Sequence, residues 1–197
     1  MKLILASGSP RRRELLETMG LREFTVVKPD FDEDAVTASS PAALVETLSE
    51  GKARAAAQAV GDPEALILAA DTVVALDGEI LGKPADEAEA CRMLRALSGR
   101  EHAVYTGFTL LQGASMLTGH EETIVRFRTL SEEEITAYVS TGEPMDKAGS
   151  YGIQGLASLF VEGIRGDYFN VMGLPVCRLG QELARFGVTF FNAPETP

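Results

Sequence analysis

Residues 66–76 read LILAADTVVAL, a segment that is apolar almost throughout. A short, continuous apolar run of this kind predicts a strand that is buried on both faces, as in the sheet of an α/β fold. Asp77-Gly78 comes next and predicts a tight turn into a second strand over residues 79–81. The stretch therefore predicts an α/β fold whose sheet contains this hairpin.

The sequence on either side predicts more strands and helices. Residues 2–6 predict a strand that turns into a helix with Ser9 as its N-cap, Pro10 at its first position and an end at Gly20. The other predicted strands cover 23–28, 101–112 and 116–128, and the other predicted helices cover 41–61 and 86–97, with two more after Ser131 and from Pro175. Residues 191–197 predict a frayed chain end.

The chain has the length of one domain. Its 197 residues are 45% hydrophobic and 24% charged, enough to bury a proper core, and residues 1–197 are expected to form one globular domain, or one domain with two lobes whose boundary the sequence does not assign. The apolar start is too short for a signal peptide, and no segment has the length of a membrane span. We expect a cytoplasmic protein that does not bind membranes.

The composition also limits the partners. A formal net charge of −11 argues against a nucleic-acid polymer, because such binding needs a basic surface that neutralises many phosphates. A small anionic ligand is compatible with this charge if basic groups gather in one place, as they do at residues 11–13. Cys91 and Cys177 lie in apolar helical patterns and predict buried, reduced thiols, and with only His102 and His120 as imidazoles no zinc site is expected.

Three consecutive arginines follow the first predicted turn, in the stretch SGSPRRR at residues 7–13. Positive side chains are unfavourable at a helix N-terminus, where unpaired N–H groups already carry partial positive charge. Together, these N–H groups, the serine hydroxyls and the guanidinium groups can bind a phosphate. The alternative is an ordinary capped helix with solvated arginines, and the motif alone does not decide between the two.

Asp71 is a lone carboxylate inside the apolar strand. Burial of a charge is costly unless the charge is paired, hydrogen-bonded or bound to a metal, so Asp71 is either an anchored structural group or the centre of a site. Lys52 and Lys83 are available as partners. Glu33, in the acidic loop DFDED at 30–34, is either solvated charge or an oxygen ligand for a hard cation such as Mg²⁺.

Gln154 is flanked by Gly152 and Gly155. Glycines allow the backbone to approach a planar ligand closely, and an amide can form two hydrogen bonds along the edge of a nucleobase. The alternative is a glycine-rich loop with a solvated amide.

Seven segments in series resemble the Maf family of nucleoside triphosphate pyrophosphatases and together cover nearly the whole chain: LASGSPRR (5–12), EGKA (50–53), AADTVV (69–74), GEILGKP (78–84), HAVYTG (102–107), DKAGSYGIQG (146–155) and NVMGLPV (170–176). The resemblance implies an inosine-triphosphatase-like α/β fold, with a long, mixed and twisted sheet flanked by helices and two lobes around a central cleft. It also implies a homodimer.

The resemblance implies a role for several residues at the reacting centre. Asp71 matches the family's general base, and Lys52 and Lys83 match its catalytic lysines. Glu33 and Asp71 fall where the family holds a divalent cation, Mg²⁺ or Mn²⁺. One departure is Gly51 in EGKA, where a better helix former is expected, so the sequence predicts a weakened helix at this point.

The substrate-binding residues that the resemblance implies are Ser7, Ser9, Arg11, Arg12, Thr72 and Gln154. Arg11, Thr72 and Gln154 resemble the subgroup that hydrolyses dTTP and UTP rather than the one that acts on 7-methyl-GTP. The Gln154 amide fits the edge of uracil or thymine, but turned over it fits cytosine equally well, so selectivity needs further contacts.

The implied activity is hydrolysis of dTTP and UTP, and of modified pyrimidine nucleotides, to the nucleoside monophosphate and pyrophosphate. Such an enzyme would sanitise the nucleotide pool. Two alternatives stay open: a pyrophosphatase of the 7-methyl-GTP type, and a non-catalytic, nucleotide-binding regulator of cell division.

Overall fold

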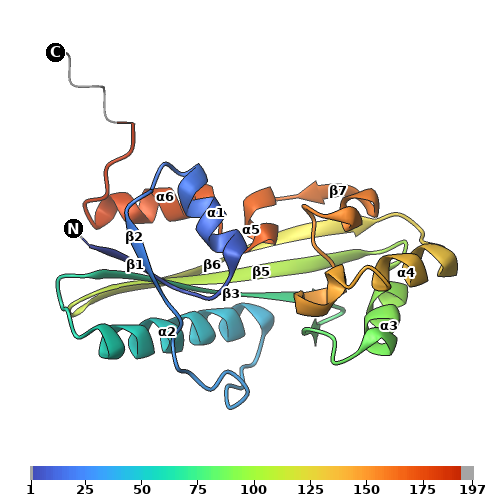
Figure 1. The fold of residues 1–197 in the computed structure, drawn as a ribbon, viewed down its shortest axis with the longest axis horizontal. Coiled ribbons are helices and arrows are strands. Elements are labelled where there is room, and N and C mark those ends of the chain that lie inside the picture. Colours follow the sequence, from blue (N-terminus) through green and yellow to red (C-terminus); the bar gives the residue numbers. More distant parts are fainter. Residues whose placement is uncertain (1, 192–197) are drawn as a thin grey trace.

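The computed structural model describes residues 2–191 as a mixed α/β protein (Figure 1). Seven strands form one sheet in the order β2-β1-β3-β5-β6-β7, and β4 pairs with β3 beside this path. β1 runs parallel to β2 and β3, and the remaining pairs are antiparallel. The strands are β1 (Leu3–Ala6), β2 (Phe24–Val27), β3 (Leu66–Leu76), β4 (Glu79–Leu81), β5 (Glu101–Gln112), β6 (Ser115–Phe127) and β7 (Val161–Arg165).

Helices cover both faces of this sheet. On one face, Ala53 and Ala56 of α2 pack on Ile67 and Ala69 of β3. The opposite face carries α1, α5 and α6, while α3 and α4 lie toward the other end of the long strands (Figure 1). The helices are α1 (Pro10–Thr18), α2 (Pro41–Val60), α3 (Glu87–Leu97), α4 (Glu132–Val139), α5 (Tyr168–Met172) and α6 (Val176–Arg185). The predicted mixed sheet flanked by helices is confirmed.

The predicted bounds agree best where local signals are strong. Strands β3, β4 and β5 span the predicted residues. Helix α2 begins after Ser40, whose hydroxyl accepts a hydrogen bond from the N–H of Ala43, and it ends before Gly61, which adopts a left-handed conformation. In α4, Ser131 and Glu134 form the predicted reciprocal capping box.

Other features were not visible in the sequence. Helix α5 and the 3₁₀ helices η1 (Glu143–Asp146), η2 (Ala148–Ser150) and η3 (Leu156–Leu159) are too short to show a hydrophobic period. The prediction of a buried Cys177 is wrong, because its side chain lies on the side of α6 opposite the buried Leu179 and Leu183 and is exposed; Cys91 is half-buried. Most of the predicted frayed end, residues 192–197, lies outside the described residues.

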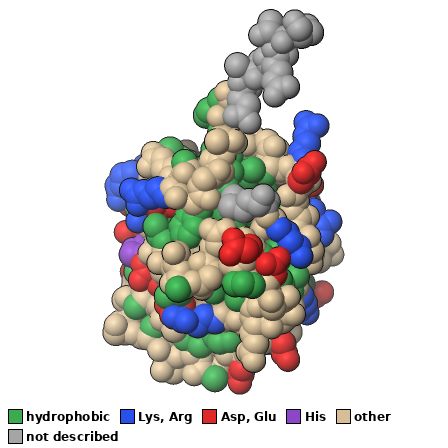
Figure 2. Space-filling view, turned by 90° about the vertical axis from the view of Figure 1, so that its left-hand side faces the viewer, with side chains coloured by type: hydrophobic (Ala, Val, Ile, Leu, Met, Phe, Trp, Pro, Cys, Tyr) green, Lys and Arg blue, Asp and Glu red, His purple; other side chains and the backbone are tan. Residues whose placement is uncertain are grey.

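The described surface carries no broad basic region at the end of the molecule near the N-terminus. Figure 2 shows that Lys and Arg side chains on this face are interleaved with Asp and Glu. Within residues 2–191, no helix has both the length and the apolar character needed to cross a membrane.

Gly51 has a packing role that the sequence did not reveal. A Cβ atom at this position would lie 2.2 Å from Cζ of Phe31, so the ring of Phe31 rests directly on the backbone of α2. Phe31 belongs to the acidic loop that precedes α2. The glycine that was predicted to weaken the helix is therefore what allows Phe31 of this loop to pack against it.

We expect Gly51→Ala to lower the free energy of unfolding by about 1 kcal/mol, because overpacking costs about 1–3 kcal/mol and outweighs the gain of about 1 kcal/mol in helix propensity. Gly180→Ala in α6 is a matched control, since its Cβ would meet only Met19 Cε at 3.8 Å, an ordinary contact. Urea denaturation of both variants tests this, and a stabilised Gly51→Ala would contradict the packing of Phe31.

Candidate active site

The edge of β3 is open over a short stretch in the middle of the sheet. Residues 66–69 of β3 pair with β1, and residues 74–76 pair with β4. Between these partners, residues 70–73 have no strand on that edge within the described part of the chain, while β5 pairs along the opposite edge. Asp71 and Thr72 lie in this gap, and because side chains alternate along a strand they point to opposite faces of the sheet.

On the α2 face, three charged side chains form one cluster. The ammonium Nζ of Lys52 lies 2.6 Å from Oδ1 of Asp71 and 2.8 Å from Oε2 of Glu33. Lys52 and Asp71 are only 7% and 8% exposed, whereas the Glu33 side chain is about half-exposed. Lys52 thereby compensates a carboxylate that would otherwise be buried at high cost.

On the α1 face, Arg12 connects three segments. Its Nε donates to the carbonyl of Gly173 at 2.9 Å, Nη1 donates to Oγ of Ser7 at 3.2 Å, and Nη2 donates to Oγ1 of Thr72 at 3.0 Å. Burial lowers the pKa of the guanidinium, and the negative charges of Asp71 and Glu33 oppose this shift. Arg12 is thus a charged group held in a fixed orientation next to the gap.

The hydroxyl of Thr72 has two partners inside the protein. Thr106 donates to the carbonyl of Asn170 at 2.8 Å, so its single proton is used there. The 2.9 Å contact between the two threonine hydroxyls must therefore run from Thr72 to Thr106, while Thr72 accepts from Arg12. Thr72 supports the orientation of Arg12, a role that its position beside Asp71 did not reveal.

The loop between β1 and α1 is shaped by Ser7. Its hydroxyl accepts from the N–H of Ser9 at 3.2 Å as well as from Arg12. Ser9 occupies the predicted N-cap position, but its side chain forms no capping hydrogen bond with the described residues. The N-terminus of α1 thus keeps N–H donors without side-chain acceptors, as an anion site requires.

The three arginines have different surroundings. Arg11 lies 3.6 Å from the carboxylate of Asp146, and Arg13 is exposed and forms no ion pair within residues 2–191. Only Arg12 points into the sheet gap. The electrostatically unfavourable helix end is therefore only partly compensated by the protein itself.

Lys83 and Gln154 do not contact the two clusters. Both are exposed, and neither forms a hydrogen bond or ion pair with the part of the chain that the structure describes. Strand β4 ends at Leu81, which pairs with Val74 at the border of the gap, and Lys83 follows two residues later. Gln154 lies in a turn that the 3.0 Å hydrogen bond from the N–H of Gly155 to the carbonyl of Gly152 closes.

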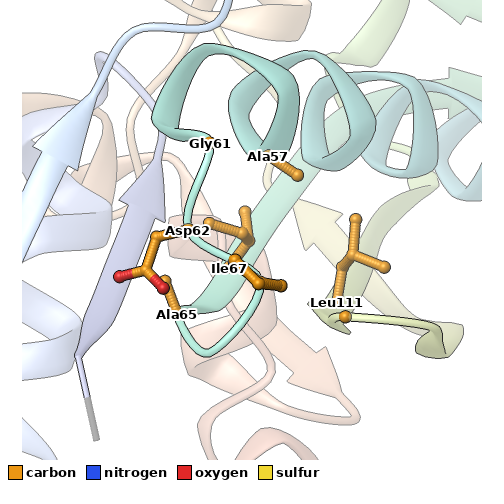
Figure 3. A pocket seen from close by; sticks show the side chains of 8 residues that line it. Ala57, Gly61, Asp62, Ala65, Ile67 and Leu111 are labelled. Carbon is orange, nitrogen blue, oxygen red and sulfur yellow. The ribbon is translucent and has the colours of Figure 1, made fainter.

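Two surface hollows lie away from these clusters. Figure 3 shows one between the end of α2 and the ends of β3 and β5, where the apolar side chains of Ala57, Ile67 and Leu111 face each other. The other adjoins the turn between β3 and β4 and includes Tyr105. Neither contains a lysine or arginine, so neither offers what a phosphate needs.

Sequence reasoning missed several supporting residues. Asn170 is fully buried and donates to the carbonyl of Val104 at 3.1 Å, and its own carbonyl accepts from Thr106. The motif NVMGLPV was noted for its resemblance, but only the fold brings it against β5. The sequence signal for this role was a polar residue, Asn170, between the apolar Phe169 and Val171, because a buried amide needs hydrogen-bond partners.

These features define a class of α/β protein. A gap in the central sheet has a buried carboxylate and a lysine on one face, and an arginine at the N-terminus of a helix on the other, an arrangement suited to a phosphorylated ligand. The family model described as "Maf-like protein" matches residues 2–186. The chain belongs to this family.

Similar proteins agree with this assignment. The chain is 57% identical to a protein from Symbiobacterium thermophilum over 97% of each chain, and 53% identical to one from Moorella thermoacetica over 95% of this chain and 96% of that one. Both are named dTTP/UTP pyrophosphatase. A solved HAM1 protein from Coxiella burnetii has the same fold, with a TM-score of 0.53 and 19% identity over 94% of this chain and 99% of that one.

Proposed function

We propose that this protein hydrolyses dTTP and UTP, and modified pyrimidine nucleoside triphosphates, to the nucleoside monophosphate and pyrophosphate. The observation that carries the proposal is the buried Asp71 in the gap of β3, with Lys52 and Glu33 on one face of the sheet and Arg12 on the other. The names of the relatives from Symbiobacterium and Moorella support the choice of substrate.

In this proposal the triphosphate lies at the N-terminus of α1. The N–H groups there, the hydroxyls of Ser7 and Ser9, and the guanidinium groups of Arg11 and Arg12 bind the phosphate oxygens. Arg12 uses three N–H groups internally, and a guanidinium has five, so two remain for the substrate. Gln154 pairs with the edge of the pyrimidine.

Asp71 acts as the general base. Its carboxylate accepts a proton from a water molecule whose oxygen attacks the α-phosphorus, and the bond from that phosphorus to the bridging oxygen breaks, releasing pyrophosphate. Lys52 compensates the charge of Asp71, and Lys83 stabilises the negative charge that develops on the leaving group. The gap in β3 gives the water and the phosphate access to an otherwise buried carboxylate.

Glu33 and Asp71 are suited to a divalent cation, Mg²⁺ or Mn²⁺. Their carboxylates lie close together, since the ammonium nitrogen of Lys52 is 2.6 Å from Asp71 and 2.8 Å from Glu33. Within the described residues, no group of three His, Cys, Asp or Glu side chains forms a closed metal cage. Two carboxylates with substrate phosphates are the usual set for Mg²⁺, which supplies charge neutralisation at the phosphates when bound.

A pyrophosphate-release assay with dTTP, UTP, CTP, ATP, GTP and 7-methyl-GTP tests the proposed function. We expect dTTP and UTP to have the highest kcat/KM. A higher kcat/KM for 7-methyl-GTP than for dTTP and UTP would assign the protein to the 7-methyl-GTP subgroup. Binding of dTTP without cleavage of any nucleotide would favour the non-catalytic regulator.

We expect excess EDTA to stop the reaction, and Mg²⁺ or Mn²⁺ to restore it, because Glu33 and Asp71 hold the cation through oxygen ligands. Glu33→Gln should raise the Mg²⁺ concentration required for half-maximal rate. Asp30→Asn is the matched control, because Asp30 lies in the same acidic loop but forms no ion pair among residues 2–191. Full activity in EDTA would remove the cation from the proposal.

Two further statements stay predictions. The protein is expected to act in the cytoplasm, where its proposed substrates occur, and to form a homodimer. Size-exclusion chromatography with light scattering measures the second directly.

A further inference from the structure

The turn that carries Gln154 is held from one side by a single carboxylate. Oε2 of Glu143 accepts from the N–H of Leu156 at 3.0 Å, and Oε1 accepts from the hydroxyl of Tyr138 at 3.0 Å. Tyr138 is 4% exposed and belongs to α4, so it anchors Glu143 to the core. Glu143 thus links the buried Tyr138 of α4 to Leu156, the residue that follows the turn.

The two glycines of the turn have a different role from the one expected. A Cβ on Gly155 would lie 2.2 Å from Oε1 of Glu143, and a Cβ on Gly152 would lie 2.7 Å from Cε of Lys147. The absence of a Cβ atom at these two glycines therefore leaves room for the side chains of Glu143 and Lys147 beside the backbone. The turn is packed against the protein, and only Gln154 at its tip is exposed.

The same side chains continue toward the N-terminus of α1. Nζ of Lys147 donates to the carbonyl of Glu143 and to Oδ1 of Asp146, both at 2.6 Å. The other oxygen of Asp146 lies 3.6 Å from Arg11. One connected polar network therefore runs from the turn of Gln154 to the helix end where the phosphates are proposed to bind.

We infer that Glu143 is a positioning residue that sets the selectivity for the pyrimidine base by fixing the turn of Gln154. The inference rests on the proposed function, in which Gln154 pairs with the base. An amide reaches the edge of a base reliably only if its side chain starts from a fixed position, and the exposed Gln154 has no partner of its own among residues 2–191 to hold it. That position is set by the backbone of the turn, which Glu143 secures.

The test is a double-mutant cycle read out as the ratio of kcat/KM for dTTP to kcat/KM for inorganic triphosphate, which has no base. We expect Gln154→Ala and Glu143→Ala each to lower this ratio by about tenfold, the effect of about one hydrogen bond. The double variant should lose no more than either single variant, because both act through the same amide. The ratio is independent of the fraction of folded enzyme, so simple destabilisation does not change it.

Two further variants separate the possible results. Glu143→Gln keeps an acceptor for the N–H of Leu156 and should restore most of the ratio. Glu162→Ala removes a carboxylate that pairs with Arg126 and should leave the ratio unchanged. An unchanged ratio in Glu143→Ala, or additive losses in the double variant, would overturn the inference while leaving the proposed function in place. A wild-type enzyme that cleaves neither dTTP nor any other nucleoside triphosphate would overturn both.

Discussion

Asp71→Asn should lower the rate of dTTP hydrolysis by a factor of about 10²–10⁴, the usual contribution of a general base, while dTTP still binds. Asparagine has the same shape but cannot accept the proton of the attacking water. Lys52 keeps its 2.8 Å contact with Glu33, so the ammonium is not left without a carboxylate and the fold should persist. Pyrophosphate release and equilibrium dTTP binding are the two measurements.

Asp77→Asn is the matched control for this prediction. Asp77 directly follows the same strand and pairs with Arg100 at 2.6 Å on the surface, away from the gap. Its loss removes one negative charge and one ion pair without touching Asp71, so the rate should stay near that of the wild type. If Asp71→Asn retained more than about a tenth of the rate, a general base would be the wrong role for it.

The sequence predicted the strands and helices well because their signals are local. The apolar run at 66–76, the Asp77-Gly78 turn and the Ser131-Glu134 capping box each act within a few residues, and all three are confirmed. The order of the strands in the sheet could not be predicted in this way, because it depends on contacts between distant segments. Strand β1 lies between β2 and β3, and only the fold leaves residues 70–73 of β3 without a neighbour on one edge.

The residues proposed for the site could be picked out in the sequence, but their division between two faces of the sheet could not. Neighbouring positions 71 and 72 point in opposite directions, so Asp71 meets α2 and Thr72 meets α1. The sequence also gave no reason to connect Gly51 with Phe31, or Glu143 with Gln154, because these contacts depend on loops folding back on helices. At such positions glycine is needed because a side chain from another segment packs directly against the backbone.

Arg12→Ala is expected to reduce both stability and activity. The substitution removes the donor to the hydroxyl of Thr72 and the carbonyl of Gly173, and one of the two donors to the hydroxyl of Ser7. Hydrogen bonds to a charged group contribute about 1.5–3 kcal/mol each, and the free energy of unfolding should fall by at least the lower of these values. The value of kcat/KM should fall about 100-fold or more, since charge-assisted bonds to phosphate are lost as well.

Arg12→Lys and Arg13→Ala distinguish geometry from charge. Lysine keeps the positive charge but ends in a single nitrogen that cannot reach three acceptors on three segments, so it should restore only part of the loss. Arg13→Ala removes the same charge from the next residue of α1, which is exposed and unpaired within residues 2–191, and should have little effect. If Arg12→Lys recovered full activity, Arg12 would act through its charge alone. Equal losses in Arg12→Ala and Arg13→Ala would mean that the helix end responds to its total charge and that the three contacts of Arg12 add nothing to it.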